Sequence, residues 1–173
     1  MGKKVISFSL DSKSISNAIR EIEEYKQEVK RKTERLRERV AERIAETASQ
    51  GFGSAVVDDL LCGGARSASV DVNVDTHGNV SVVVANGEDA VWVEFGAGVY
   101  YNGQAGSSPH PKGGELGMTI GGYGKGYGAR NVWGFYEDGE LKLTHGTPAA
   151  MPMYNAMKTV CAEITDIAKE VFS

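Results

Sequence analysis

The sequence predicts an α+β fold with a small antiparallel sheet, a long charged N-terminal helix, a packed C-terminal amphipathic helix and a long glycine-rich insertion. Three patterns support this prediction. Apolar side chains recur at three- and four-residue steps over residues 12–49 and 152–172, and valines alternate with polar residues between 68 and 84. A chain of 173 residues suits one modest core, so we expect a single domain, residues 1–173, with residues 96–146 as the insertion.

The N-terminal quarter is expected to form a short strand and then the long helix. Val5 to Leu10 alternate imperfectly with serines, which predicts the strand. One of the polar side chains at 11–14 should cap the helix, which is expected to run to about residue 49 and end at Gly51. Between Arg20 and Arg43, nine residues are basic and seven acidic, leaving only a narrow apolar seam. That seam either lies on the sheet or packs partly against another subunit.

The sheet is expected to come from the valine-rich region. Residues 68–74 and 80–84 form two alternating runs joined by a turn at Gly78, which predicts a hairpin. Residues 90–95 could continue as a third strand or form a short helix, and their apolar residues do not decide between the two.

Two further elements follow. Asp138-Gly139 lies between the apolar runs 132–136 and 140–144 and predicts a second hairpin. The last helix should begin with Pro152 in its first turn and run through Phe172, and its apolar face needs a docking surface, which we expect to be the sheet.

The insertion is the least ordinary part of the chain. Residues 96–146 hold 15 of the 22 glycines and seven of the 14 aromatic side chains. Ordering some 50 such residues costs roughly 50–100 kcal/mol of backbone entropy, whereas burying seven aromatic side chains returns roughly 15–20 kcal/mol. Apart from its hairpin, we therefore expect the segment from Gly96 to Arg130 to be a loop that becomes ordered only against a neighbouring subunit or ligand.

Composition restricts the compartment and the partners. The formal charge of −4 argues against a sequence-wide nucleic-acid surface. Cys62 and Cys161 are expected to be reduced, buried, small apolar residues of a cytosolic protein. No apolar run approaches the ~20 residues that span a bilayer, and the apolar stretch after Lys4 is too short for a signal peptide.

The spacing of the glycines, histidines and serines matches no phosphate-binding, metal-binding or nucleophile motif. The glycines between Gly121 and Gly128 match neither the phosphate-binding loop nor the dinucleotide fingerprint. The three histidines lie in separate turns without metal-ligand spacing, and a surface role is expected for each: His77, His110 and His145. Ser107 and Ser108 lack the strand-to-helix context of a nucleophile. We expect no cofactor, no metal and no catalytic residue.

Two other classes of function remain open. An enzyme could use the glycine-rich segment as an active-site lid. A module for single-stranded nucleic acid could use the aromatic side chains of the insertion for stacking, but residues 96–146 carry a net charge of zero, so the electrostatic attraction that dominates such binding is missing.

Two motifs in order resemble one protein family. Val93-Glu94-Phe95-Gly96 is followed, after the glycine-rich stretch, by Gly146-Thr147-Pro148-Ala149-Ala150-Met151-Pro152-Met153 at the start of the last helix. This combination resembles the head-to-tail joining or minor tail components of tailed phages and prophages grouped as "gene product ten-like" proteins. Ala97 departs from the threonine that the family more often shows.

The resemblance implies a structural subunit of a phage neck or tail, acting in head-to-tail joining or tail completion. Such a subunit is made in the bacterial host cytoplasm and forms a homo-oligomeric ring in the virion. The ring contacts adjacent neck or tail proteins, and DNA passes through it without specific recognition. No membrane partner and no catalytic residue are implied.

Roles can then be predicted for the loop Gly96–Arg130 and for the first motif. We expect Gly96–Arg130 to reach a neighbouring subunit, the alternative being that its aromatics cover their own domain. The anchors of this arm would be Tyr100, Tyr101, Tyr123, Tyr127 and Trp133. Glu94, Phe95 and Gly96 are expected to form a structural turn, in which the Glu94 carboxylate caps the glycine by accepting backbone N–H groups or else turns outward to solvent.

Overall fold

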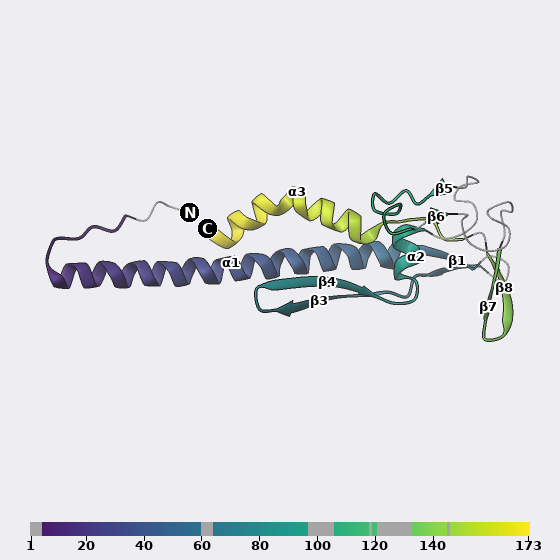
Figure 1. Ribbon diagram of the computed structural model, residues 1–173, viewed down its shortest axis with the longest axis horizontal. Coiled ribbons are helices and arrows are strands. Elements are labelled where there is room, and N and C mark those ends of the chain that lie inside the picture. The colour runs from purple at the N-terminus through teal and green to yellow at the C-terminus, as the bar shows by residue number, and fades with distance from the viewer. Residues whose placement is uncertain (1–4, 60–63, 97–105, 118, 121–132, 145) are drawn as a thin grey trace.

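The computed structural model describes residues 5–59, 64–96, 106–117, 119–120, 133–144 and 146–173. It shows an elongated α+β arrangement built along one long helix, which confirms the predicted fold class (Figure 1). The elements, in chain order, are α1 (Ser12–Ser54), β1 (Val56–Asp59), β2 (Gly64–Ser67), β3 (Asp71–His77), β4 (Val80–Asn86), α2 (Ala90–Phe95), β5 (Gly106–Ser107), β6 (Thr119–Ile120), β7 (Trp133–Glu137), β8 (Glu140–Thr144) and α3 (Pro152–Phe172).

Helix α1 begins as the polar residues predict but ends later. The Asp11 carboxylate accepts a hydrogen bond from the Ser14 N–H at 2.9 Å and caps the helix. The prediction that Gly51 ends the helix is wrong, because α1 continues to Ser54 and the backbone becomes extended only at Ala55. Gly51 instead provides a close approach: a Cβ atom there would lie 2.9 Å from the Cβ of Pro152 in α3.

The predicted strand over Val5–Leu10 is also wrong. Residues 5–9, all within the described part of the chain, form no strand, and Val5, Phe8 and Leu10 are exposed. The Ser9 N–H donates to the Ser14 hydroxyl at 2.9 Å, which turns the segment back over the start of α1 (Figure 1). A strand needs a partner for its backbone groups, and this local hydrogen bond competes with that pairing.

In the part of the chain that the structure describes, the strands form four separate antiparallel pairs instead of one sheet. The pairs β3–β4 and β7–β8 confirm both predicted hairpins, and the turn residues Asp138 and Gly139 have the positive φ values, 52° and 82°, that a tight hairpin requires. The pair β1–β2 falls in a stretch expected to be a loop, and β5–β6 falls inside the glycine-rich insertion. Residues 90–95 form a helix, which resolves the choice that the sequence left open.

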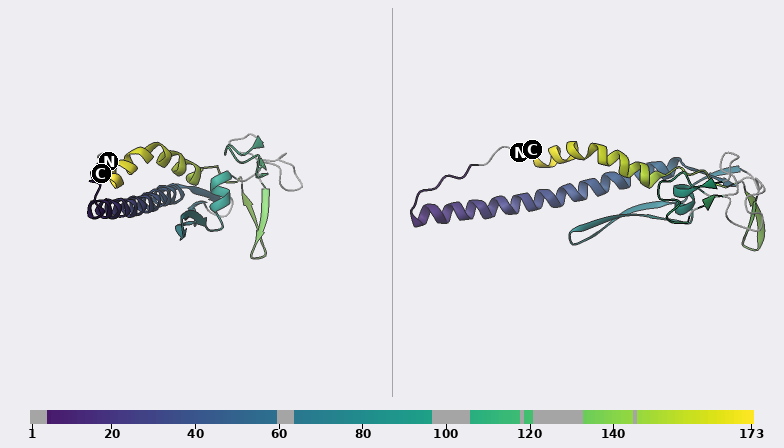
Figure 2. Two further views of the ribbon diagram at one scale, coloured as in Figure 1. Left: turned by 60° about the vertical axis from the view of Figure 1, so that its left-hand side comes forward. Right: turned by 45° about the horizontal axis from the view of Figure 1, so that its top comes forward.

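Helix α3 begins at Pro152 as predicted, but it docks on α1 and not on a sheet (Figure 1). The two helices run antiparallel, and small side chains let them approach closely, since Ala48, Ala156 and Val160 are at most 1% exposed. The β3–β4 hairpin lies on the other side of α1, and the two views in Figure 2 show the same three-layer arrangement.

The core is small and lies near the C-terminal end of α1. Phe52, Ala55 and Val93 form its buried centre, and half-buried side chains from β1, β3 and α3 surround them. Cys161 is exposed, so the prediction of a buried residue there is wrong. It follows the buried Val160 by one position, which turns it about 100° away from α1. Cys62 lies outside the described residues.

The close approach at Gly51 predicts that alanine substitutions at Gly51 and at Gly53 change the stability of the protein in opposite directions. Gly51→Ala is expected to destabilise the protein by about 1–3 kcal/mol, because the new methyl group would push Pro152 and α3 away from α1. Gly53→Ala is the matched control. Its Cβ would meet no atom of the described chain within 4 Å, so the better helix former should stabilise by about 0.5–1 kcal/mol. Urea unfolding of both variants measures the difference, and equal effects would contradict it.

Candidate functional site: the Glu94 junction and the projecting end of the long helix

Glu94 joins two helices that are far apart in sequence. Its side chain points from α2 to the start of α3, where its carboxylate oxygens accept the backbone N–H groups of Met153 at 2.8 Å and Tyr154 at 2.9 Å. Pro152 has no N–H, and the preceding Met151 has a left-handed backbone and forms no side-chain cap within the described structure. Glu94 therefore supplies the cap from another element, placing a negative charge at the positive end of the helix dipole.

The outcome for Glu94 differs in part from the expectation. The carboxylate does accept backbone N–H groups and is only 6% exposed, so it does not turn to solvent. The prediction that it caps the glycine turn is wrong, because its donors belong to α3. The N–H of Gly96 instead bonds to the carbonyl of Trp92 at 2.8 Å. The turn itself is real, since Gly96 has φ 81° and a Cβ there would lie 3.1 Å from the nitrogen of Ala149.

The junction that Glu94 forms between α2 and the start of α3 also includes His110. Its Nε2 lies 3.2 Å from Oε1 of Glu94, and its ring packs between Phe95 and Tyr154 with centroid distances of 4.4 and 5.3 Å. The N–H of Lys112 donates to Nδ1 at 3.0 Å, so Nδ1 acts as an acceptor and the proton of the neutral ring lies on Nε2, the atom that faces Glu94. The expected surface role for His110 is therefore wrong: the residue is 8% exposed.

The other candidate polar residues have local roles. His77 is exposed beside Asp75, at 3.0 Å, as expected, and His145 lies outside the described residues. The Ser108 hydroxyl donates to the carbonyl of Phe95 and accepts the N–H of His110, so its proton is not directed at the imidazole ring. Among the described residues, no group of three His, Cys, Asp or Glu side chains is placed to hold a metal ion.

A second buried carboxylate fastens the β1–β2 hairpin to α2. Arg66 donates two hydrogen bonds to Asp89, at 2.6 and 2.9 Å, and the Ser69 N–H adds a third at 2.8 Å. The bond with the Arg66 guanidinium is the main reason that the pKa of Asp89 lies below its usual value of 3.8, although burial opposes the shift. Asp89 and Glu94 thus both use their oxygens to connect elements of the chain.

The expected interface aromatics fall mostly where the structure gives no description. Tyr100, Tyr101, Tyr123 and Tyr127 lie outside the described residues, and for Trp133 only the backbone is described, at the start of β7 opposite Thr144. Their role as anchors stays a prediction. Phe95 and Gly96 are described and belong to the junction with Glu94.

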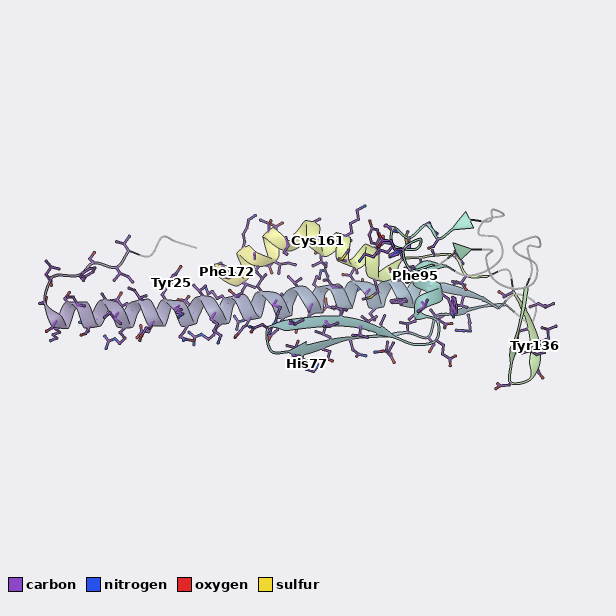
Figure 3. All side chains as sticks on the ribbon, in the orientation of Figure 1. Tyr25, His77, Phe95, Tyr136, Cys161 and Phe172 are labelled. Atoms are coloured by element: carbon purple, nitrogen blue, oxygen red, sulfur yellow. The ribbon has the colours of Figure 1, made fainter. Side chains whose placement is uncertain are left out.

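The N-terminal part of α1 extends past every element that covers the rest of it. The last residue of α3, Ser173, accepts a hydrogen bond from Lys32 at 3.3 Å, and the turn of the β3–β4 hairpin meets Arg37, which donates to the carbonyl of Gly78 at 2.8 Å. Residues 12–28, which we call the projecting end, lie beyond both contacts and extend for about 25 Å (Figure 1). Figure 3 shows Tyr25 farther out along α1 than Phe172, near the end of α3.

The projecting end has an apolar face. Ile15, Ile19 and Ile22 are spaced by four and three residues, which puts them on one side of the helix, and they are 39%, 53% and 54% exposed. The sequence indicated this seam, but it could not show that α3 ends before reaching it. No helix within the described ranges combines the length and apolar character needed to cross a bilayer.

The chain matches no protein-family model, no curated protein and no solved structure. The resemblance to phage neck and tail components therefore rests on the two motifs around Glu94 and Pro152. In the structure, these two motifs contact each other directly, because Glu94 of the first motif caps the helix that begins in the second.

The cap predicts a clear cost for removing the Glu94 charge. Glu94→Gln should destabilise the protein by about 1–3 kcal/mol, because a neutral amide has one acceptor oxygen for two backbone N–H groups and the His110 ring. Glu88→Gln, at an exposed position five residues before the start of the motif, is the matched control and should stay within about 0.5 kcal/mol of wild type. Thermal unfolding tests both, and equal melting temperatures would contradict the capping role.

The lowered pKa of Asp89 predicts an acid-dependent contribution to stability. Because the folded-state pKa lies below the unfolded one, the contribution is complete above the unfolded value near 3.8 and disappears as the pH falls through the folded value. Asp89→Asn should therefore cost about 1–2 kcal/mol at pH 7, and the gap to wild type should narrow below about pH 4. Urea unfolding at pH 7 and pH 3 measures this, with the exposed Asp71→Asn as control. A gap that does not change with pH would count against the Arg66 interaction.

Proposed function

We propose that this chain is a structural subunit that assembles with copies of itself, and that the assembly is a ring in the neck or tail of a tailed phage, used in head-to-tail joining or tail completion. The observation that carries the proposal is the projecting end of α1. A helix with three exposed isoleucines on one face is typical of a subunit whose partner is another chain.

The size of the apolar face fits repeated contacts in a ring. The three isoleucines are about half exposed, so covering them returns about 1 kcal/mol each. One such contact is weak, but a closed ring makes it once per subunit and cannot lose a subunit without breaking two. The resemblance to phage head-to-tail joining proteins supplies the location, and the ring it implies is compatible with these modest contacts.

The opposite end of the molecule offers a second surface for the same assembly. The short pairs β5–β6 and β7–β8 lie at the far end of the long axis from the projecting end (Figure 1). In our proposal, the glycine-rich arm Gly96–Arg130 and its aromatic anchors reach a neighbour or an adjoining ring from there. Two contact surfaces at opposite ends of an elongated subunit suit a protein that connects successive layers.

The junction residues favour this structural function over an enzyme with a glycine-rich lid. Ser108 and His110 are buried polar residues within the insertion, Glu94 lies two residues before it, and each uses its polar atoms to hold backbone groups of the chain. A general base or nucleophile needs a free atom directed at a substrate.

A charge on the apolar face tests the proposed function. Ile19→Glu keeps a good helix former at an exposed site, so the fold should persist while self-association weakens. Light scattering over a range of concentrations should show an oligomer for wild type and a smaller mass for the variant, and electron microscopy of wild type should show closed rings. Val91→Glu, on the exposed face of α2, is the control and should assemble normally. Wild type that stays monomeric at every concentration would rule the proposal out.

A further inference from the structure

We propose that the projecting end of one copy docks into an apolar groove between α1, α3 and β4 of the next copy. This inference rests on the proposed function, because it names the surface that receives each subunit's helix end. It commits to a second copy of this chain as the occupant of the groove.

The groove lies on the same face of α1 as the exposed isoleucines. It has a volume of about 330 Å³, and α3 and β4 form its two walls. Its floor consists of helix positions that continue the spacing of the projecting end, and its apolar lining is Leu36, Val40, Ala41, Ile44, Val83 and Ile164. Since a cavity of about 150 Å³ holds a benzene-sized group, this groove has room for two aliphatic side chains.

The projecting end and the groove are complementary surfaces. The isoleucines of the projecting end remain 39–54% exposed although the segment before α1 turns back over the start of the helix, whereas the groove has walls and a floor but no side chain of the described chain filling its 330 Å³. Ile164 at the rim is still 44% exposed. A helix from a second copy would cover the rim and its own apolar face at once.

Charge favours the same pairing. Between Arg20 and Glu28 the projecting end carries two basic and four acidic residues, for a net charge of −2. The part of α1 that leads into the groove, Lys30 to Arg39, carries six basic and two acidic residues, for a net charge of +4. Two copies therefore attract each other when the acidic end of one approaches the basic middle of the other.

Within the described structure, Arg37 places an unsatisfied hydrogen-bond donor at the groove. It lines the cavity, and its Nε is buried without a hydrogen-bond partner among the described residues, while the two terminal nitrogens contact Gly78 and Glu38. A buried donor without an acceptor is costly. A carboxylate from the acidic part of the projecting end is the kind of group that would satisfy it.

Each subunit then uses its projecting end once and its groove once. Because the two surfaces differ, the contact is head-to-tail, and its repetition generates a ring when the rotation between subunits closes.

Mixing two single variants tests the pairing. Ile19→Glu damages only the projecting end, and Ile164→Glu damages only the groove; both residues are exposed, so both variants should fold. Each alone should raise the concentration at half-assembly by about tenfold or more. Mixed together, they should form a heterodimer, since one retains an intact groove and the other an intact helix end. Val91→Glu keeps both surfaces and is the control: it should associate with either variant.

The outcomes separate this inference from the proposed function. An oligomer that forms normally with Ile164→Glu, or two weakened variants that do not associate on mixing, would overturn the groove and leave the structural-subunit proposal standing. A wild-type dimer that depends on both residues would support the docking contact and overturn the ring. Wild type without any self-association would overturn both.

A covalent trap gives an answer even if a charged variant misfolds. In a background of Cys62→Ser and Cys161→Ser, a subunit with Ile19→Cys and a subunit with Ile164→Cys should form a mixed disulfide on oxidation if the two positions approach within about 7 Å. Ile19→Cys paired with Val91→Cys is the matched control. Cross-linking no faster than in this control would contradict the docking.

Discussion

The two hydrogen bonds that Glu94 accepts from the first turn of α3 determine which part of α1 the rest of the molecule leaves uncovered. They fix the first turn of α3 beside the C-terminal end of α1, where Gly51 admits Pro152. From that point, 21 residues of helix reach back only as far as Lys32. The exposed state of the projecting end is therefore a consequence of where α3 starts and how long it is, and not of a locally unusual sequence.

The same junction brings several distant parts of the chain together. Glu94 connects α2 with α3, and His110 adds the 106–117 segment through its 3.2 Å contact with the Glu94 carboxylate and two ring contacts. Asp89, five residues earlier, connects α2 with the β1–β2 hairpin through Arg66. Helix α2 has only six residues, so its own hydrogen bonds give it little stability, and these carboxylate contacts are what hold it in place. Such polar contacts specify one arrangement of elements around an apolar core of only a few side chains.

Sequence reasoning succeeded where local signals decide the structure. The hairpins follow from alternation and turn residues, and the two long helices follow from spacing and caps. It failed where a distant residue decides. Gly51 looks like a helix end until Pro152 is placed against it, and His110 looks like a surface residue until Glu94 and two rings surround it. That Glu94 accepts backbone N–H groups could be foreseen from its chemistry, but the identity of its donors depends on the docking of α3, which no local pattern encodes.

The charge pattern of α1 explains how an uncovered helix end can remain a helix. An isolated helix of fewer than about 12–15 residues is marginal in water, but the projecting end is the continuation of a 43-residue helix, so it adds turns without a new nucleus. Pairs such as Arg20–Glu24, at 3.9 Å, and Glu28–Lys32, at 3.5 Å, each add about 0.3–0.5 kcal/mol along its polar faces. The apolar face is thus already formed before a partner arrives. Association then loses little conformational entropy on this helix, which allows a contact of only three isoleucines to contribute to assembly.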